Sequence, residues 1–312
     1  MRRARYILCS IAVLSFILIT SLPPHTVNGF HGRTFKSPES RELSLKDDHL
    51  VSEARAVAYA NVPYAAVINF CLGGRYGLLS QWAFMNHKDY SQTQKYDYFQ
   101  GDSLRAPHGH FFTPPAWGKA AFLWQLLEKK TEHRWFLLAD CDALYMKLDE
   151  SVEQLLGHLG YEHGAQGTIN VVVARDLGDS TFNTGFMLVR NEDWSLNFFA
   201  DVLRLSRLPA VREHPWWEQH AMHTLYKENK HNEQIHIGIV GDRSRLNAFT
   251  VVRSEYRDGY SFVRHQVNCP GHPENNATTF EQCAENFAIF FCSRFRSRHV
   301  EECSTQSSRE RS

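Results

Sequence analysis

Two aspartates one residue apart, Asp140 and Asp142, follow an apolar run at residues 135–139. Carboxylates at this spacing can share Mg²⁺ or Mn²⁺, hard cations that prefer oxygen ligands and keep positions open for phosphate oxygens. A cation held there would bind a diphosphate and neutralise the charge that builds on a departing nucleotide. An isolated Asp-x-Asp is more often a solvated turn. Here it follows a predicted strand, and because open α/β sheets bind ligands beyond the carboxyl ends of their strands, its position favours a metal site.

The elements that would position these aspartates alternate between strand and helix patterns. This alternation predicts an α/β fold, a single domain with a mostly parallel central sheet. Strands are expected at residues 64–70, 96–100, 135–139, 170–174, 186–189 and 235–240, and helices at residues 79–94, 117–127, 194–206 and 216–228.

Composition excludes few functions but disfavours one. The chain of 312 residues has 34 basic and 34 acidic residues, so no strong net field recruits nucleic acid. We therefore expect no nucleic-acid partner. A homo-oligomer is compatible with the sequence, which does not determine the oligomeric state.

The N-terminal residues predict a membrane anchor. Residues 6–22 carry no charge, follow three arginines at positions 2, 3 and 5, and would span roughly 25 Å as a helix. The arginines predict a cytosolic tail at 1–5 and a luminal orientation for the remainder. A cleaved signal peptide is the alternative. The expected organisation is then a transmembrane signal anchor at 6–22, a stem at 23–62, a catalytic domain at 63–293 and a polar C-terminal tail at 294–312.

The cysteines and a sequon agree with a secretory compartment. Asn276 begins an Asn-Ala-Thr glycosylation sequon. Four late cysteines allow three pairings, of which proximity favours Cys269 with Cys283 and Cys292 with Cys303. A zinc site is the alternative, although the paired C-x-x-C spacing is lacking. We expect Cys71 and Cys141 to be buried free thiols.

Several further motifs occur in a specific order. They are Asn86-His87-Lys88-Asp89-Tyr90, Tyr96-Asp97-Tyr98, Trp117-Gly118-Lys119, the segment 182–195 with Asn183-Thr184-Gly185, and His214-Pro215-Trp216-Trp217-Glu218-Gln219. With the Asp-x-Asp, they make the chain from about Pro63 to Cys269 resemble the family-34 glycosyltransferases, which include galactosyl-, xylosyl- and α-1,6-mannosyltransferases. The resemblance implies the GT-A fold, a Rossmann-like nucleotide-diphospho-sugar transferase fold, and a retaining Golgi enzyme that is a single-pass type II membrane protein.

The resemblance also assigns roles to residues. It implies that Asp140, Asp142 and His265 bind Mn²⁺ (or Mg²⁺), that Lys119, Asp176, Asn183 and Gly185 bind the donor, and that Glu218 and Gln219 lie near the reacting anomeric carbon. The alternatives from the residues alone are a structural histidine, a surface lysine and a simple turn at 183–185. The donor would be a nucleoside-diphosphate sugar, a UDP-sugar or GDP-mannose, and the acceptor a glycan hydroxyl of a glycoprotein or polysaccharide.

The implied chemistry is transfer with retention. A carboxylate such as Glu218 can either attack the sugar covalently or stabilise an oxocarbenium-like state, and we favour the second. The departing diphosphate would then take the acceptor proton on the same face of the sugar.

One departure from the family pattern concerns the diphosphate. After His265 the chain reads Gln-Val-Asn-Cys-Pro-Gly-His, without the lysine that the family places there. Arg264, or another cation brought in by the fold, is a candidate substitute, and the departure leaves donor identity and the strength of diphosphate binding open. Two other functions are alternatives: a catalytically silent lectin-like or scaffold relative, and a metal-dependent hydrolase or nucleotidyltransferase.

Overall fold

The computed structural model describes residues 63–71, 77–101, 116–161, 168–178, 181–252, 254–267, 277 and 279–309. The expected cytosolic tail, membrane span and stem at 1–62 lie outside this part of the chain, as does the sequon residue Asn276. Within the described part, we find no helix with the length and apolar character needed to cross a membrane.

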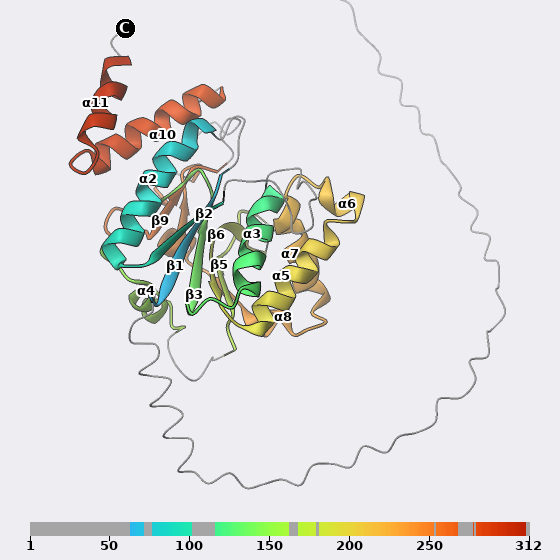
Figure 1. Cartoon of the computed structure of the whole chain (residues 1–312). Helices are drawn as coiled ribbons and strands as arrows, with labels where there is room; N and C mark the ends of the chain where they lie inside the picture. Colours follow the sequence, from blue (N-terminus) through green and yellow to red (C-terminus); the bar gives the residue numbers. More distant parts are fainter. Residues whose placement is uncertain are drawn as a thin grey trace, which may run out of the picture. The chain divides into compact units, whose positions relative to one another are not determined.

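Strands and helices alternate over most of the described chain (Figure 1). The strands are β1 (Ala65–Phe70), β2 (Asp97–Gly101), β3 (Trp135–Ala139), β4 (Ala143–Tyr145), β5 (Val171–Ala174), β6 (Asn183–Arg190), β7 (Ile237–Val240), β8 (Asn247–Phe249) and β9 (Val263–His265). The helices are α2 (Gly77–Gln94), α3 (Ala116–Glu128), α4 (Val152–His158), α5 (Asp193–Leu205), α6 (Pro209–Arg212), α7 (Trp217–Glu228), α8 (Glu233–His236), α9 (Arg243–Leu246), α10 (Phe280–Phe295) and α11 (Val300–Arg309).

The described part of the central sheet has six strands in the order β2-β1-β3-β6-β5-β7. Strands β1, β2 and β3 are mutually parallel, and β5 is parallel to β7, but β6 runs antiparallel to both of its neighbours. The prediction of a mostly parallel sheet is therefore corrected to a mixed sheet. The reason lies in the connection from β5 to β6, because residues 175–182 are too few for the crossover that parallel neighbours require.

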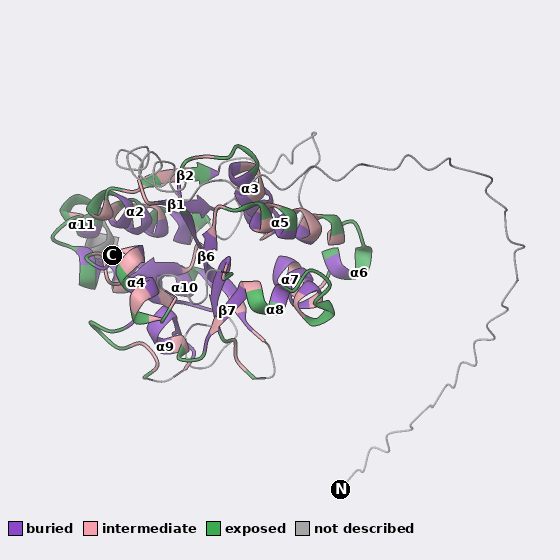
Figure 2. Cartoon of the chain, turned by 90° about the horizontal axis from the view of Figure 1, so that it is seen from below, coloured by how far each residue is buried: buried purple, intermediate pink, exposed green. Residues whose placement is uncertain are grey.

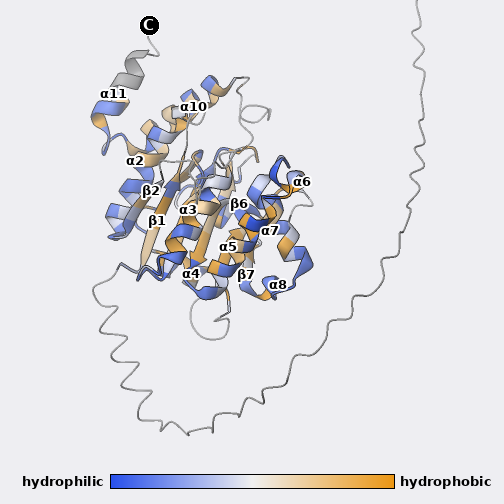
Figure 3. Cartoon of the chain, turned by 45° about the vertical axis from the view of Figure 1, so that its right-hand side comes forward, coloured by the Kyte–Doolittle hydropathy of each residue, from blue (hydrophilic) through white to orange (hydrophobic). Residues whose placement is uncertain are grey.

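Two apolar clusters cover the two faces of this sheet. On one face, Phe136 and Leu138 pack with side chains from α3, α5 and α7. On the other, Trp135 and Leu137 of the same strand pack with Tyr90 of α2 and with the smaller sheet. Burial on both faces explains why the central strands are continuously apolar rather than alternating. Strand β1, for example, is mostly purple in the burial view (Figure 2) and mostly orange in the hydropathy view (Figure 3).

A second described sheet, in the order β4-β9-β8, was not expected from the sequence. Its strands are only three residues long, which is too short for a periodic pattern to indicate them. Strand β4 begins directly after the Asp-x-Asp, and β9 ends at His265. This sheet therefore joins two segments of the chain that contain expected metal ligands.

The C-terminal region is helical. Helix α10 packs on α2, and its residues Phe287 and Phe291 are buried with Trp82. The predicted Cys292–Cys303 disulfide is confirmed, and it joins α10 to α11. Cys283 is also disulfide-bonded, while its expected partner Cys269 lies outside the described residues. The boundary between a catalytic domain at 63–293 and a tail at 294–312 stays a prediction.

The prediction that Cys71 and Cys141 are free thiols is wrong. Their sulfur atoms form a disulfide across 70 residues of sequence. The sequence indicated only that both cysteines are buried, but β1 and β3 are neighbours in the sheet and bring the two side chains together.

Candidate active site

One cavity of about 400 Å³ opens beside the carboxyl end of β3. All nine residues expected to form the site line it: Lys119, Asp140, Asp142, Asp176, Asn183, Gly185, Glu218, Gln219 and His265. They come from α3, β6, α7, β9 and the loops after β3 and β5. The fold thus brings together residues that are spread over nearly 150 positions of the chain, from 119 to 265.

The two aspartates are held by backbone contacts on both sides of their loop. The amide of Asp140 donates to the carbonyl of Gly185 on β6 at 2.8 Å, and the amide of Gln266 donates to the carbonyl of Asp142 at 2.8 Å. Strand β4 then pairs antiparallel with β9, with Ala143 opposite His265. This pairing places the imidazole Nε2 of His265 3.2 Å from a carboxylate oxygen of Asp142.

The donor set fits a divalent cation. Asp140, Asp142 and His265 each offer one ligand atom, and these atoms lie within 4.8 Å of one another. Two carboxylates and one imidazole suit Mn²⁺, and Mg²⁺ is compatible with the carboxylates. Burial lowers the pKa of His265, but the carboxylates of Asp142 and Asp140 raise it more, so its pKa lies above the usual value. A cation bound here would take the place of the His265 proton between the imidazole and the carboxylates of Asp140 and Asp142.

Gly185 leaves the space that His265 occupies. A Cβ added at residue 185 would lie 2.0 Å from Cε1 and 2.7 Å from Nδ1 of His265. Those distances are far below van der Waals contact, so glycine is required here by the close approach of a ring. The Asn-Thr-Gly motif is therefore linked to the candidate metal site as well as to the sugar that the resemblance suggested.

Lys119 lies between two carboxylates inside the cavity wall. Its ammonium is 2.6 Å from Asp140 and 2.8 Å from Glu218, and it also donates to the carbonyl of Thr184 at 3.3 Å. Burial lowers the pKa of Lys119, but the two carboxylates raise it more, so its pKa is above the usual value and the side chain is charged. The surface-lysine alternative is excluded because the residue is only 6% exposed.

Among the described residues, one carboxylate oxygen of Glu218 has protein partners and the other has none. Its Oε1 is bound by Lys119 and accepts a hydrogen bond from the hydroxyl of Thr184 at 3.1 Å. Its buried Oε2 has no hydrogen-bond partner among the described residues. Burial raises the pKa of Glu218, Lys119 lowers it and Asp140 raises it, with a net rise. The arrangement leaves Oε2 as a carboxylate atom that a substrate could meet.

Gln219 links the expected donor residues to the sheet. Its side-chain amide donates to Asp176 at 2.9 Å, and its carbonyl oxygen accepts from the backbone amide of Thr184 at 3.0 Å. The Asp176 carboxylate thereby has a fixed position at the cavity wall, after β5. Thr184 was not assigned a role from the sequence, yet it contacts Glu218 and Gln219 together.

Asn183 also has partners that the sequence did not indicate. Its side-chain oxygen accepts from the amide of Gly185 at 2.8 Å and from the side chain of Asn247 at 3.1 Å. Asn247 begins β8 of the smaller sheet. Asn183 thus connects β6 of the central sheet to the sheet that contains His265.

Arg264, the candidate substitute for the missing lysine, is directed elsewhere. Its guanidinium lies 3.6 Å from the ring centroid of Phe290 on α10, and it is not among the residues that line the cavity. Burial lowers its pKa to about 10. Within the described part of the chain, Arg264 thus packs on α10 and is not in a position to bind a diphosphate in the cavity.

The segment before Glu218 is a tight turn with unusual backbone geometry. Trp217 has a positive φ of 39°, which bulky residues rarely adopt, and its amide donates to the carbonyl of His214 at 2.9 Å. Trp216 is 49% exposed and lines the cavity. The turn directs Glu218 into the cavity while leaving an aromatic side chain at its edge.

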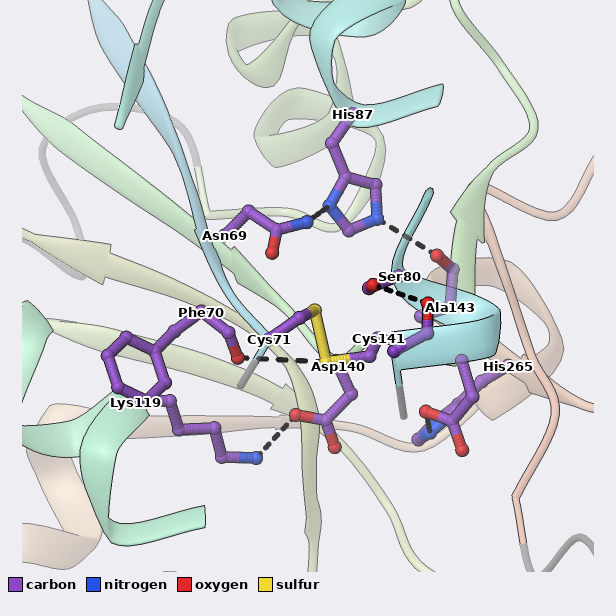
Figure 4. The surroundings of a disulfide bond; sticks show 12 residues. Asn69, Phe70, Cys71, Ser80, His87, Lys119, Asp140, Cys141, Ala143 and His265 are labelled. Atoms are coloured by element: carbon purple, nitrogen blue, oxygen red, sulfur yellow. Dashed lines mark hydrogen bonds and ion pairs between the residues drawn. A yellow bond between two sulfur atoms is a disulfide. The ribbon is translucent and has the colours of Figure 1, made fainter. Parts of the chain in front are cut away.

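A buried histidine, His87, contacts the residue that directly follows the two aspartates. In Figure 4, His87 of α2 lies between Asn69 of β1 and Ala143 of β4. Its Nδ1 is 2.7 Å from the side-chain amide nitrogen of Asn69, and its Nε2 is 2.9 Å from the carbonyl oxygen of Ala143. Burial lowers the pKa of His87 to about 4, so it is neutral. The Asn86-His87 motif does not by itself indicate these contacts, because they join α2 to β1 and β4.

The chain is similar to known glycosyltransferases. The model of the galactosyl transferase GMA12/MNN10 family matches residues 76–276. No curated protein matched this chain in a sequence comparison.

Solved structures also resemble it. A glycosyltransferase involved in the glycosylation of the major capsid of PBCV-1 overlays with a TM-score of 0.54 and 13% identity, covering 73% of this chain and 100% of the other. At that identity the likeness shows the fold alone. GlyE of Streptococcus pneumoniae TIGR4 gives a TM-score of 0.43 and 14% identity over 77% of this chain and 64% of its own. Mouse xyloside xylosyltransferase 1 gives 0.40 and 11% over 67% of this chain and 98% of its own. We draw nothing further from these two.

Proposed function

The chain belongs to the galactosyl transferase GMA12/MNN10 family of glycosyltransferases, and on that premise we propose that it transfers a hexose or pentose from a nucleoside-diphosphate sugar to a glycan hydroxyl. Transfer proceeds with retention, giving an α-linkage, and depends on Mn²⁺ or Mg²⁺. The donor is a UDP-sugar or GDP-mannose, and the acceptor belongs to a glycoprotein or polysaccharide.

One observation carries the proposal. The acidic and histidine side chains that fit a cation lie in the same cavity as Glu218, and Lys119 joins the two groups by contacting Asp140 and Glu218. A diphosphate at the cation would therefore place its sugar near a buried carboxylate. A simple sugar-binding protein has no need of this pairing.

A bound cation would polarise the diphosphate and neutralise the negative charge of the departing nucleotide. Asp140, Asp142 and His265 would hold it. Asp176 is placed to accept hydrogen bonds from donor-sugar hydroxyls, because Gln219 orients its carboxylate at the cavity wall. The sugar then lies between Asp176 and Glu218.

Glu218 stabilises positive charge on the sugar ring. A buried carboxylate acts strongly on such charge because little water screens it. Its Oε2 faces the sugar with negative charge, while Lys119 and Thr184 hold Oε1 in place. The acceptor hydroxyl passes its proton to the departing diphosphate on the same face of the sugar, which gives retention without a sugar bound covalently to the protein.

The cellular place of the reaction is part of the proposal and rests on the sequence. The uncharged residues 6–22 after three arginines support a type II orientation in the Golgi membrane with the catalytic domain in the lumen. The disulfides Cys71–Cys141 and Cys292–Cys303 are typical of an oxidising compartment.

The test is binding and turnover of the purified full-length protein against a panel of UDP- and GDP-sugars, with Mn²⁺, with Mg²⁺ and with EDTA. We expect one donor to bind only with metal, and the anomeric configuration of the product, read by NMR, to match that of the donor. Failure of every donor to bind would favour the lectin-like alternative. Diphosphate cleavage that ignores glycan acceptors would favour a hydrolase.

A further inference from the structure

The middle residue of the Asp-x-Asp is covalently attached to a neighbouring strand. Cys141 lies between Asp140 and Asp142, and its disulfide partner Cys71 directly follows the last residue of β1. The two Cα atoms are 5.6 Å apart, inside the usual range for a disulfide. Figure 4 shows the sulfur–sulfur bond beside the Asp140 carboxylate and its contact with Lys119.

The disulfide continues the strand register beyond the sheet. Strands β1 and β3 are parallel, and their last paired residues are Asn69 and Ala139. Two positions further along each chain lie Cys71 and Cys141. The disulfide therefore holds the segments after β1 and β3 together where the hydrogen-bonded ladder between these strands has ended. This is the edge at which α/β sheets bind ligands.

The aspartate loop is then restrained from three directions. Gly185 of β6 accepts from the amide of Asp140, and the amide of Gln266, next to β9, donates to the carbonyl of Asp142. The disulfide supplies the third restraint, from β1. A hydrogen bond can lengthen as the loop moves, but a covalent bond restrains the position of Cys141. It therefore also limits the movement of the Asp140 and Asp142 carboxylates on either side.

From this geometry we infer that the Cys71–Cys141 disulfide is a positioning device for the metal site, so that metal affinity depends on its oxidation. The inference rests on the proposed function, because it concerns the same cation. Cys71 and Cys141 do not contact the cation; they act through Asp140 and Asp142. Opening the disulfide frees the loop on the β1 side, and the cation must then order carboxylates that the oxidised protein holds in place.

The chain offers a matched control. The Cys292–Cys303 disulfide joins α10 to α11, and neither helix contributes a residue to the cavity lining. Removing this disulfide also lowers the free energy of unfolding. A loss of metal affinity that came from general destabilisation would therefore occur in both cases.

The first experiment measures Mn²⁺ binding by calorimetry and by electron paramagnetic resonance on full-length protein without donor. The variants are Cys71→Ala, Cys141→Ala, the double variant, and the control Cys292→Ala/Cys303→Ala. We expect the first three to bind Mn²⁺ about 10- to 100-fold more weakly, the range for lost outer-sphere support, and the control to match the wild type. Because either single substitution opens the same bond, the double variant should bind no more weakly than the singles. Turnover should recover at high Mn²⁺, which shows as a raised KM for the metal with a smaller change in kcat.

A second experiment covers the case in which the variants fail to fold. Folded protein with Cys283→Ala, Cys292→Ala and Cys303→Ala, in which Cys71–Cys141 is the one disulfide left among the described cysteines, is treated with tris(2-carboxyethyl)phosphine. The phosphine takes an oxygen from water and becomes a phosphine oxide, while the disulfide takes two electrons and two protons and becomes two thiols. After anaerobic removal of the reagent, Mn²⁺ affinity should fall by the same factor and return on reoxidation, with unchanged far-ultraviolet circular dichroism.

The outcomes separate the two proposals. If the wild type binds no Mn²⁺, the proposed metal site is wrong. If the wild type binds and the opened protein binds equally well, the positioning role is wrong while the metal site stands. An equal loss in the Cys292→Ala/Cys303→Ala control would also overturn the positioning role, because the effect would then be general.

Discussion

The ring of His265 occupies the place where a side chain on Gly185 would begin, with Cε1 only 2.0 Å from the position of an added Cβ. The Asn-Thr-Gly motif and the late histidine, 80 positions apart in the sequence, are therefore one steric unit. A glycine that the resemblance assigned to the donor also determines where the third candidate metal ligand can lie.

Gly185→Ala should displace His265 and weaken Mn²⁺ binding by about tenfold or more, since one of three ligands loses its position. Calorimetry on the purified protein measures the affinity. Gly241→Ala is the matched control, because a Cβ there meets nothing within 4 Å. Equal affinity in Gly185→Ala and wild type would place His265 outside the metal site.

Asp142→Ala should abolish Mn²⁺-dependent donor binding, and His265→Ala should weaken metal binding less completely. A carboxylate supplies charge as well as a ligand atom, whereas the imidazole supplies a neutral ligand. The control is Asp149→Ala, which removes an exposed aspartate near the site in sequence. A titration with unchanged metal affinity would remove the substituted residue from the ligand set.

Glu218→Gln should leave donor binding nearly intact and lower turnover by about 10²-fold or more, the scale for a lost electrostatic contribution. The amide keeps the shape of the side chain but not its charge. Steady-state kinetics and donor binding are measured on the same preparation. Glu213→Gln alters an exposed glutamate paired with Arg212 and serves as the control. Turnover at the wild-type level would rule out the role given to Glu218.

Lys119→Met should destabilise the fold by about 3–5 kcal/mol, the cost of leaving a buried charge without its partner. The variant leaves the carboxylates of Asp140 and Glu218 facing each other. Adding Glu218→Gln should recover part of that loss, because it removes one of the two charges. Denaturant unfolding measures each free energy.

The Lys119 series has a surface control in Lys130→Met. Lys130 and Asp193 form a pair whose side chains are 73% and 85% exposed, and we expect a change of about 1 kcal/mol or less. If Glu218→Gln added to Lys119→Met gave a further loss rather than a recovery, the bridging role of Lys119 would be wrong.

The stability of the protein should fall between pH 6.5 and about 4 through His87. Burial lowers the pKa of His87 to about 4, below its value in the unfolded chain. Above pH 6.5 both states are neutral and the residue contributes no pH dependence. As the pH falls below 6.5 the unfolded chain binds a proton that the folded chain does not, which costs up to about 1.4 kcal/mol per pH unit until the folded pKa is reached.

Unfolding of wild type and His87→Gln at several pH values checks this slope. The variant should be less stable at pH 7, because it loses contacts with Asn69 and Ala143, but it should lose less stability on acidification. Parallel curves for the two proteins would show that His87 does not titrate in this range.

Much of the fold was predictable because its signals are local. The expected strand at 135–139 matches β3, and the expected helix at 117–127 is contained in α3. The start of the expected strand at 235–240 was wrong, because Glu233–His236 forms the short helix α8 and β7 begins only at Ile237. The direction of β6 followed from the length of a connection, which apolar patterning does not report.

The candidate site was predictable as a set of residues but not as an arrangement. The resemblance named nine residues, and the fold brings all nine to one cavity. Their roles stay predictions. The partners of Lys119 were unexpected: it was assigned to donor binding, yet it contacts Asp140 and Glu218. Those contacts depend on how α3 and α7 pack against the sheet, which is not encoded in any single segment.

The sequence by itself determined the alternation of elements, the family and the chemical types of the site residues, because backbone preferences and short motifs are properties of neighbouring positions. The tertiary structure decided the pairing of Cys71 with Cys141, the closeness of Gly185 to His265 and the bridge made by Lys119. Each is a contact between segments that meet only when sheet order and register are set, and the free energy of packing both faces of the sheet sets them.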